Sequence, residues 1–168
     1  MAESYGGVFG AIPYAFRESD SWFFRIYVVV GTFAALFVAV LTALALVVEL
    51  GRTEGLTQGG LAAFSRSLFV LLGFAAVAPL LAPTLLVARR HRRDDRVHEF
   101  YDQALAVAGY GFLASLYLAL IISVPAEFQE PTSSAFVRTL YALPRLTAIV
   151  PPVLAVGGIV VAHRKLRR

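Results

Sequence analysis

A run of 23 residues without a charged side chain, at positions 26–48, constrains this chain more than any other feature. Coiled into a helix that rises about 1.5 Å per residue, such a run reaches about 35 Å, which is enough to cross a hydrocarbon core of about 30 Å. Three more long apolar blocks follow it in the chain. The sequence therefore predicts an all-α integral membrane bundle of four transmembrane helices, at about 22–48, 64–88, 100–124 and 137–162.

The composition agrees with a membrane location. Hydrophobic residues make up 58% of the chain and charged residues 15%, whereas soluble domains contain about 25% charged residues. We therefore expect one four-helix transmembrane domain at 22–168, preceded by an interfacial segment at 1–21, and no separate soluble catalytic domain. Cysteine is absent, which excludes thiolate chemistry and cysteine-ligated metal sites.

The N-terminal segment combines glycines with aromatic and aliphatic side chains and turns polar just before the first apolar block. Pro13 limits any helix on its N-terminal side, so we expect a short amphipathic turn at the lipid headgroups rather than a stable long helix. Ser19, Asp20 or Ser21 can cap the start of the first span.

An arginine-rich loop joins the second and third apolar blocks. Short loops rich in Lys and Arg tend to stay in the cytoplasm, so this loop sets the orientation of the chain. With both termini on the side of the loop, eleven of the 15 Lys and Arg residues lie inside and four outside. We expect two helical hairpins in the cell membrane with both termini cytoplasmic. Anionic lipid headgroups, rather than nucleic acid, are the expected ligands of the loop's arginines, which are Arg89, Arg90, Arg92, Arg93 and Arg96.

Two rows of small residues recur at intervals of four positions, a spacing that places them on one helix face. Small side chains let two helix backbones approach closely, and this approach drives helix association in lipid. In a chain so rich in alanine, ordinary packing within the molecule explains such rows as well. The rows predicted to pack are Gly31, Ala35, Ala39 and Ala43 in the first span, and Gly111, Ser115 and Ala119 in the third.

A sparse polar stripe runs along the third span, where Gln103, Tyr110 and Tyr117 recur every seven residues. Their polar tips should face another helix or a wet cavity rather than lipid tails. Arg145 lies near the outer end of the fourth span, where its side chain can reach the headgroups or bind an anion. Because prolines bend the second and fourth spans, the stripe supports a small transporter or channel as an alternative function.

A cluster of imidazole and carboxylate side chains falls on one face if the loop region is helical. Such groups bind divalent metals, but the five interleaved arginines would repel a cation. We therefore predict a solvated helix extension with local ion pairs, and neither a metal nor a cofactor. A lipid-modifying enzyme that uses this face is the least favoured function. The cluster consists of His91, Asp94, Asp95, His98 and Asp102.

Three stretches carry a resemblance. They are Gly-Ala-Ile-Pro-Tyr-Ala-Phe-Arg at 10–17 with Ser-Asp-Ser at 19–21, Leu-Leu-Val-Ala-Arg-Arg-His-Arg-Arg at 85–93, and Ala-Leu-Ala-Val-Ala-Gly-Tyr at 104–110. With them, the chain resembles small uncharacterised four-span membrane proteins of halophilic archaea. Fourteen arginines to one lysine fit a high-GC genome of that kind. The resemblance implies a location in an archaeal cell membrane and supplies no activity or ligand.

The expected function follows from the scarcity of reactive groups inside the spans. We expect a non-enzymatic integral membrane protein that acts as a structural or accessory component, through helix packing in a homo-oligomer or a larger membrane complex.

Overall fold

The computed structural model describes residues 7–53, 60–93 and 99–166, and within these ranges the regular structure is helical throughout, without a strand. Three helices are long and apolar enough to cross a membrane: α2 (Trp22–Arg52), α3 (Gly60–His91) and α4 (Glu99–Ser123). A fourth crossing is formed by Arg145–Leu166, which joins the short 3-10 helix η2 (Arg145–Ile149) to α6 (Val150–Leu166). The structure thus confirms an all-α, multi-pass membrane protein.

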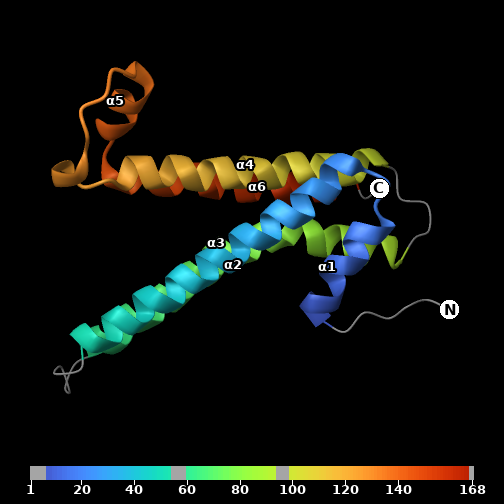
Figure 1. The fold of residues 1–168 in the computed structure, drawn as a ribbon, viewed down its shortest axis with the longest axis horizontal. Coiled ribbons are helices and arrows are strands. Elements are labelled where there is room, and N and C mark those ends of the chain that lie inside the picture. The colour runs from blue at the N-terminus through green and yellow to red at the C-terminus, as the bar shows by residue number, and fades with distance from the viewer. Residues whose placement is uncertain (1–6, 54–59, 94–98, 167–168) are drawn as a thin grey trace.

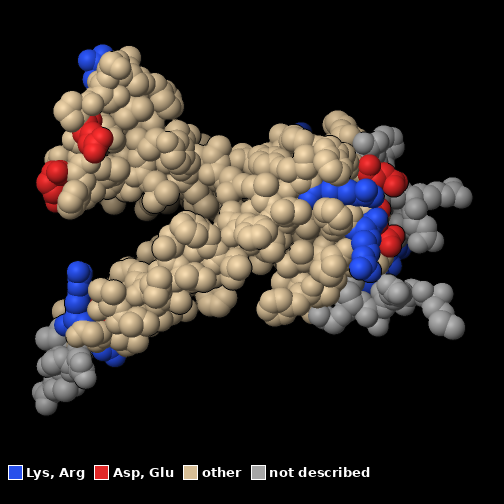
Figure 2. All heavy atoms as spheres, in the orientation of Figure 1, with Lys and Arg blue, Asp and Glu red and all other residues tan. Residues whose placement is uncertain are grey.

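The four long helices form two pairs (Figure 1). Helix α2 packs along α3, and α4 packs along α6. The pairs meet at the end that contains the start of α4 and the last turns of α3 and α6, which we call the arginine end. They diverge toward the other end, which we call the open end, so that the molecule has the outline of a V in Figures 1 and 2.

The core lies at the arginine end. All five buried residues of α2 fall between Phe24 and Ala35, in the half of the helix nearest that end. Leu80, Val87 and Ala88 of α3 meet them there, and the first half of α4 completes the core. Toward the open end, most side chains of α2 and α3 are exposed on the surface of the molecule.

The N-terminal segment forms a longer helix than the expected short turn. Helix α1 (Gly7–Glu18) contains 12 residues and includes Pro13 in its interior. Its buried residues, Ala11 and Ala15, belong to the same core as α3, and α1 packs mainly on α3. Tertiary packing against α3 therefore outweighs the cost of an internal proline.

The start of the fourth span differs from the expected start near 137. A short helix, α5 (Ala135–Tyr141), is followed by a break, and the crossing begins only at Arg145. Pro144 explains the break, because the residue before a proline disfavours the helical conformation and proline itself donates no backbone hydrogen bond. A one-turn 3-10 helix, η1 (Ala126–Phe128), lies between α4 and α5.

Candidate functional site

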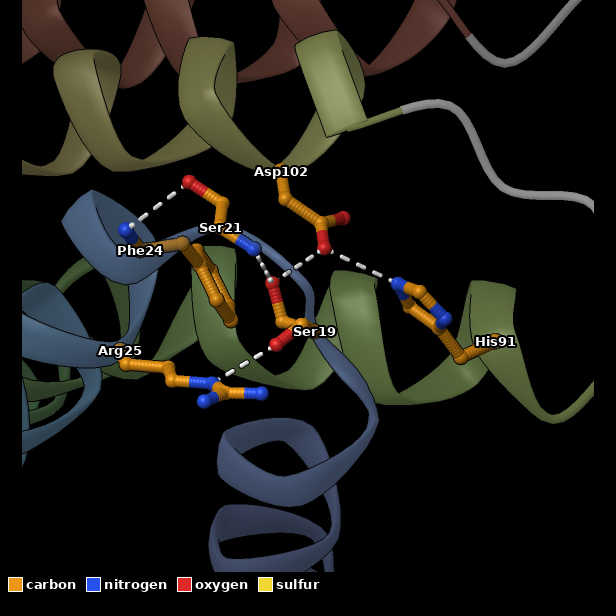
Figure 3. A network of polar contacts seen from close by, with 6 residues as sticks. All are labelled: Ser19, Ser21, Phe24, Arg25, His91 and Asp102. Carbon is orange, nitrogen blue, oxygen red and sulfur yellow. Dashed lines mark hydrogen bonds and ion pairs between the residues drawn. The ribbon is translucent and has the colours of Figure 1, made fainter.

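A buried carboxylate joins three segments at the arginine end (Figure 3). Asp102 lies in the first turns of α4 with 1% of its surface exposed. Its Oδ2 atom accepts a hydrogen bond of 2.5 Å from the Ser19 hydroxyl and lies 3.0 Å from Nε2 of His91. Ser19 belongs to the connection between α1 and α2, and His91 ends α3. We call these three residues the Asp102 junction.

The corner between α1 and α2 is built to present Ser19. The Ser19 hydroxyl also accepts the backbone N–H of Ser21, and the Ser21 hydroxyl caps α2 by accepting the N–H of Phe24. Arg25 closes the corner from the other side, because its Nε donates to the Ser19 carbonyl oxygen over 2.7 Å. Residues 19–25 are therefore held in place by contacts among themselves, in addition to the hydrogen bond from Ser19 to Asp102.

The Asp102 junction has the composition of a catalytic triad without its geometry. In a triad, the hydroxyl bonds to the imidazole, which takes its proton, and the carboxylate orients the imidazole. Here both Ser19 and His91 contact the carboxylate, and Ser19 is fully buried. The Asp102 Oδ1 atom is buried and has no partner among the described residues. Hydrogen bonds to a buried carboxylate hold elements together, and this arrangement activates no nucleophile.

A second polar contact at the same end joins α4 to α6. The Tyr101 hydroxyl lies 2.7 Å from Nδ1 of His163, and Tyr101 itself is buried. Side chains of α4 at the arginine end thus contact three other segments: the connection between α1 and α2, the end of α3, and α6.

Tyr27 packs at the crossing of α2, α3 and α4. Its hydroxyl donates to the Leu80 carbonyl oxygen over 2.7 Å, in the turn of α3 between Pro79 and Pro83. Its ring lies against Gly109, where an added Cβ would clash with the tyrosine ring. Only glycine at 109 therefore lets α4 approach α2 this closely.

The predicted polar stripe of α4 does not line one cavity. The Tyr110 ring lies 5.1 Å from that of Tyr27 and 5.2 Å from that of Phe23, so it faces α2. Gln103 is half-buried, whereas Tyr117 is 66% exposed. Arg145 is exposed at the start of η2.

The predicted packing rows are each only partly used within the molecule. Gly31 and Ala35 are buried, and a Cβ at Gly31 would lie 3.3 Å from the Leu80 carbonyl oxygen of α3. Ala39 and Ala43 are exposed instead and line a shallow groove of about 240 Å³ between α2 and α3. On α4, Ser115 is buried and Ala119 is half-buried, whereas a Cβ at Gly111 would meet nothing within 4 Å.

The arginines at the end of α3 surround two cavities. The larger, of about 400 Å³, lies between α1 and α3 and is lined by Gly7, Val8, Ala11, Leu85, Arg89, Arg92 and Arg93. The smaller, of about 170 Å³, is lined by Leu86, Arg89, Arg90, Arg93 and His163. Arg96 falls outside the residues that the structure describes.

The predicted imidazole and carboxylate cluster can be placed only in part. Asp94, Asp95 and His98 lie outside the described residues. His91 and Asp102 do come together, but they approach each other from two different helices and not along one helix face. In the described part of the chain, no three His, Asp or Glu side chains are placed to hold a metal ion.

Sequence reasoning missed the role of Ser19 and the two histidine contacts. Ser19 was expected only as a helix cap, and its pairing with Asp102 spans 83 positions of sequence. The one available signal was that Asp102 is the last charged residue before a long apolar run in α4, which makes its carboxylate a candidate for pairing.

Comparisons with known proteins assign the chain to a family. No curated protein and no solved structure matches the chain. A family model described as a domain of unknown function, DUF8056, matches residues 1–167, which is nearly the whole sequence. The chain therefore belongs to the DUF8056 family.

Proposed function

We propose that this protein is a non-enzymatic accessory component of the cell membrane, which packs its helices against a second copy of itself or against a larger membrane complex. The observation that carries the proposal is a set of small residues that face away from the molecule. Among them, Gly111, Gly157 and Gly158 lie on α4 and α6, and a Cβ at any of the three would meet nothing within 4 Å.

Exposed glycines inside a transmembrane helix call for an explanation. A glycine in a helix interior costs about 0.5–1 kcal/mol relative to alanine, and these three gain no close contact within the chain. In lipid, such positions let a second helix approach closely. Ala39 and Ala43 add a comparable small-residue surface on the α2–α3 pair.

The polar groups of the arginine end support a structural role over an enzymatic one. Ser19, His91 and Asp102 are engaged with one another, and Tyr101 is engaged with His163. Such contacts hold α4 against its neighbours and leave no activated nucleophile. We therefore favour the accessory role over that of a lipid-modifying enzyme.

We also propose that the arginine end faces the cytoplasm. Eleven of the 15 Lys and Arg residues then lie on the cytoplasmic side, as is typical of inner loops. α1 and the last turn of α6 lie at the arginine end in Figure 1, so both termini would be cytoplasmic and the chain would form two hairpins.

A small transporter or channel is the second candidate. It is supported by the divergence of the two helix pairs toward the open end and by Tyr117, whose exposed ring lies two turns beyond Tyr110 on α4. A solute path between the pairs would pass this ring. Uptake or leakage of a solute panel by protein-containing liposomes, altered by Tyr117→Phe, would favour transport.

The mass of the particle in a mild detergent or nanodisc tests the accessory role. We expect a multiple of the 18.2 kDa chain, or a co-purified membrane protein in stoichiometric amount. Gly111→Leu with Gly157→Leu should reduce the association, because leucine blocks close approach of helices. Gly51→Leu is the matched control, since Gly51 is equally exposed but lies at the end of α2. A lone monomer without any partner would contradict the proposal.

A further inference from the structure

The larger cavity at the arginine end has two chemically different walls. One wall comes from the beginning of α1 and from Leu85 of α3, and it is apolar. The other wall consists of the guanidinium-bearing side chains Arg89, Arg92 and Arg93. Among the described residues that line the cavity, none is Asp or Glu. A cavity with an apolar side and a cationic side suits a molecule that has an acyl part and an anionic part.

The charges of Arg89 and Arg93 are not neutralised by the described residues. Within residues 7–53, 60–93 and 99–166, neither side chain has a hydrogen-bond or ion-pair partner, and both line the larger and the smaller cavity. The nearby buried carboxylate of Asp102 is already engaged with Ser19 and His91. Several guanidinium groups around shared space repel one another unless an anion lies between them.

The dipole of α1 favours an anion at the same place, whereas that of α3 acts on the arginines. Arginines at the C-terminal end of α3 are stabilised by its dipole, which keeps them at this position without using their hydrogen-bond donors. The 12-residue α1 contributes its first two residues, Gly7 and Val8, to the cavity wall, and its first turn contains no acidic residue. The N-terminal end of a helix attracts phosphate groups, so α1 adds to the field of the arginines.

The surroundings of the cavity place it at the depth of lipid headgroups. It lies where the apolar part of α3 gives way to Arg89, and the adjacent α1 exposes Phe9 with 90% of its surface accessible. A short helix with large exposed apolar residues lies at the boundary between headgroups and acyl chains. An occupant of the cavity would therefore have its phosphate among the arginines and its glycerol and first methylenes against Val8 and Leu85.

We propose that the cavity between α1 and α3 binds the phosphate of an anionic phospholipid. Arg89 and Arg93 are the principal ligands, since guanidinium groups bind phosphate oxygens in pairs of parallel hydrogen bonds. The bound lipid fastens α1 to the end of α3. This inference goes beyond the accessory role and does not depend on it, because the lipid would occupy the cavity in a monomer as well as in a complex.

Native mass spectrometry of the detergent-solubilised chain tests the site, with phosphatidylglycerol and phosphatidylcholine of the same acyl chains as probes. We expect phosphatidylglycerol to bind preferentially, and Arg89→Gln with Arg93→Gln to weaken its binding about tenfold or more. The matched control is Arg52→Gln with Arg138→Gln, which removes the same charge from exposed positions outside the two cavities. Equal losses in both double variants, or no loss in the first, would overturn the assignment.

Hydrogen exchange of the α1 amides locates the bound lipid and separates it from free phosphate. Phosphatidylglycerol should slow exchange in residues 7–18 of the native sequence and leave that of the Arg89→Gln, Arg93→Gln variant unchanged. Inorganic phosphate at equal concentration should give no protection, because it has no acyl chain to contact Val8 and Leu85. Equal protection by inorganic phosphate would overturn the lipid assignment, and protection confined to α2 or α6 would show that the lipid binds elsewhere. Unchanged elution of both variants serves as the folding check.

Discussion

The two ends of the molecule are held together in different ways. At the arginine end, α1, α2, α3 and α4 converge on the Asp102 junction and on the Tyr27 ring, with buried side chains between them. At the open end, no polar contact among the described residues joins the two pairs: Ser65 donates to Glu49 and Arg66 to Thr53 within the α2–α3 pair, and Gln129 donates to the Val124 carbonyl oxygen just after α4. Beyond Tyr110, no hydrogen bond or ring contact of α4 reaches α2 or α3 in the described part of the chain.

This difference shows what joins helices in a membrane. Lipid tails are as apolar as leucine, so burial of apolar area gives little drive for one helix to meet another there. Close backbone approach and interhelical hydrogen bonds provide that drive instead. The two helix pairs meet where the chain supplies glycine and polar side chains, and they separate where it supplies mostly large apolar ones.

The largest expected effect is from Gly109→Val, which breaks the contact between the pairs. The new Cβ would clash with the Tyr27 ring, and the Tyr27 hydroxyl is held by its hydrogen bond to the Leu80 carbonyl oxygen. We expect a loss of about 3 kcal/mol in the free energy of unfolding in detergent, at the upper end of overpacking effects. Gly51→Val is the control, since its Cβ meets nothing within 4 Å and Gly51 lies at the end of α2, outside the proposed packing surface. Equal effects of the two changes would refute the Tyr27 crossing.

Next in size is Asp102→Ala, which removes the acceptor at the Asp102 junction. Ser19 and His91 would lose their common partner, and we expect a destabilisation of about 2 kcal/mol, as for hydrogen bonds to charged groups. Amide exchange should accelerate in residues 19–25 and at the start of α4, while the open end keeps its rates. Asp102→Asn should cost less, because its amide oxygen still accepts a hydrogen bond. Asp20→Asn, at an exposed neighbouring position, is expected to leave exchange unchanged.

A smaller effect is expected from Tyr27→Phe, which keeps the ring packing and removes the hydroxyl. The Leu80 carbonyl oxygen would lose its side-chain donor, at a cost of about 1 kcal/mol. Thermal unfolding monitored by circular dichroism in detergent measures the loss. Tyr117→Phe is the matched control, because Tyr117 is exposed. A loss for Tyr117→Phe as large as that for Tyr27→Phe would mean that the open end also holds the pairs together.

The smallest effect is expected from Ser65→Ala at the open end. It removes the 2.7 Å bond to Glu49, which lies within one helix pair, and we expect a change of about 0.5 kcal/mol. Hydrogen exchange should rise near the ends of α2 and α3 and remain constant in α4 and α6. A spread of the effect into α4 would show that the pairs are coupled at the open end.

The sequence predicts the elements of this fold better than their arrangement. Runs without charge marked all four membrane crossings, because each must satisfy its own backbone hydrogen bonds in lipid. The break before Arg145 was missed, since Pro144 lies in a stretch whose hydropathy still permits a helix. The length of helix α1 was missed because Pro13 and the glycines oppose a helix locally, whereas the packing of Ala11 and Ala15 in the core supports it.

The sequence predicted the cluster of arginines at the candidate site, but it did not predict which side chains contact one another there. Arg89, Arg90, Arg92 and Arg93 cluster in sequence, so their grouping in space follows from the end of one helix. The contacts of Asp102 depend on how α1, α3 and α4 pack together. The residue pattern of a single helix does not specify this packing. Tyr110 was expected to face another helix or a cavity, but the sequence could not specify that Tyr27 and Phe23 would be its neighbours.

The separation of the pairs can be measured by electron–electron double resonance in lipid nanodiscs, since the chain contains no cysteine of its own. Spin labels at the exposed positions Val48→Cys and Leu120→Cys report on the open end, and labels at Ile26→Cys and Val107→Cys report on the arginine end. We expect a clearly longer distance for the open-end pair of labels than for the arginine-end pair. Equal distances at both ends would contradict the account, because they would mean that the four helices form a closed bundle along their whole length.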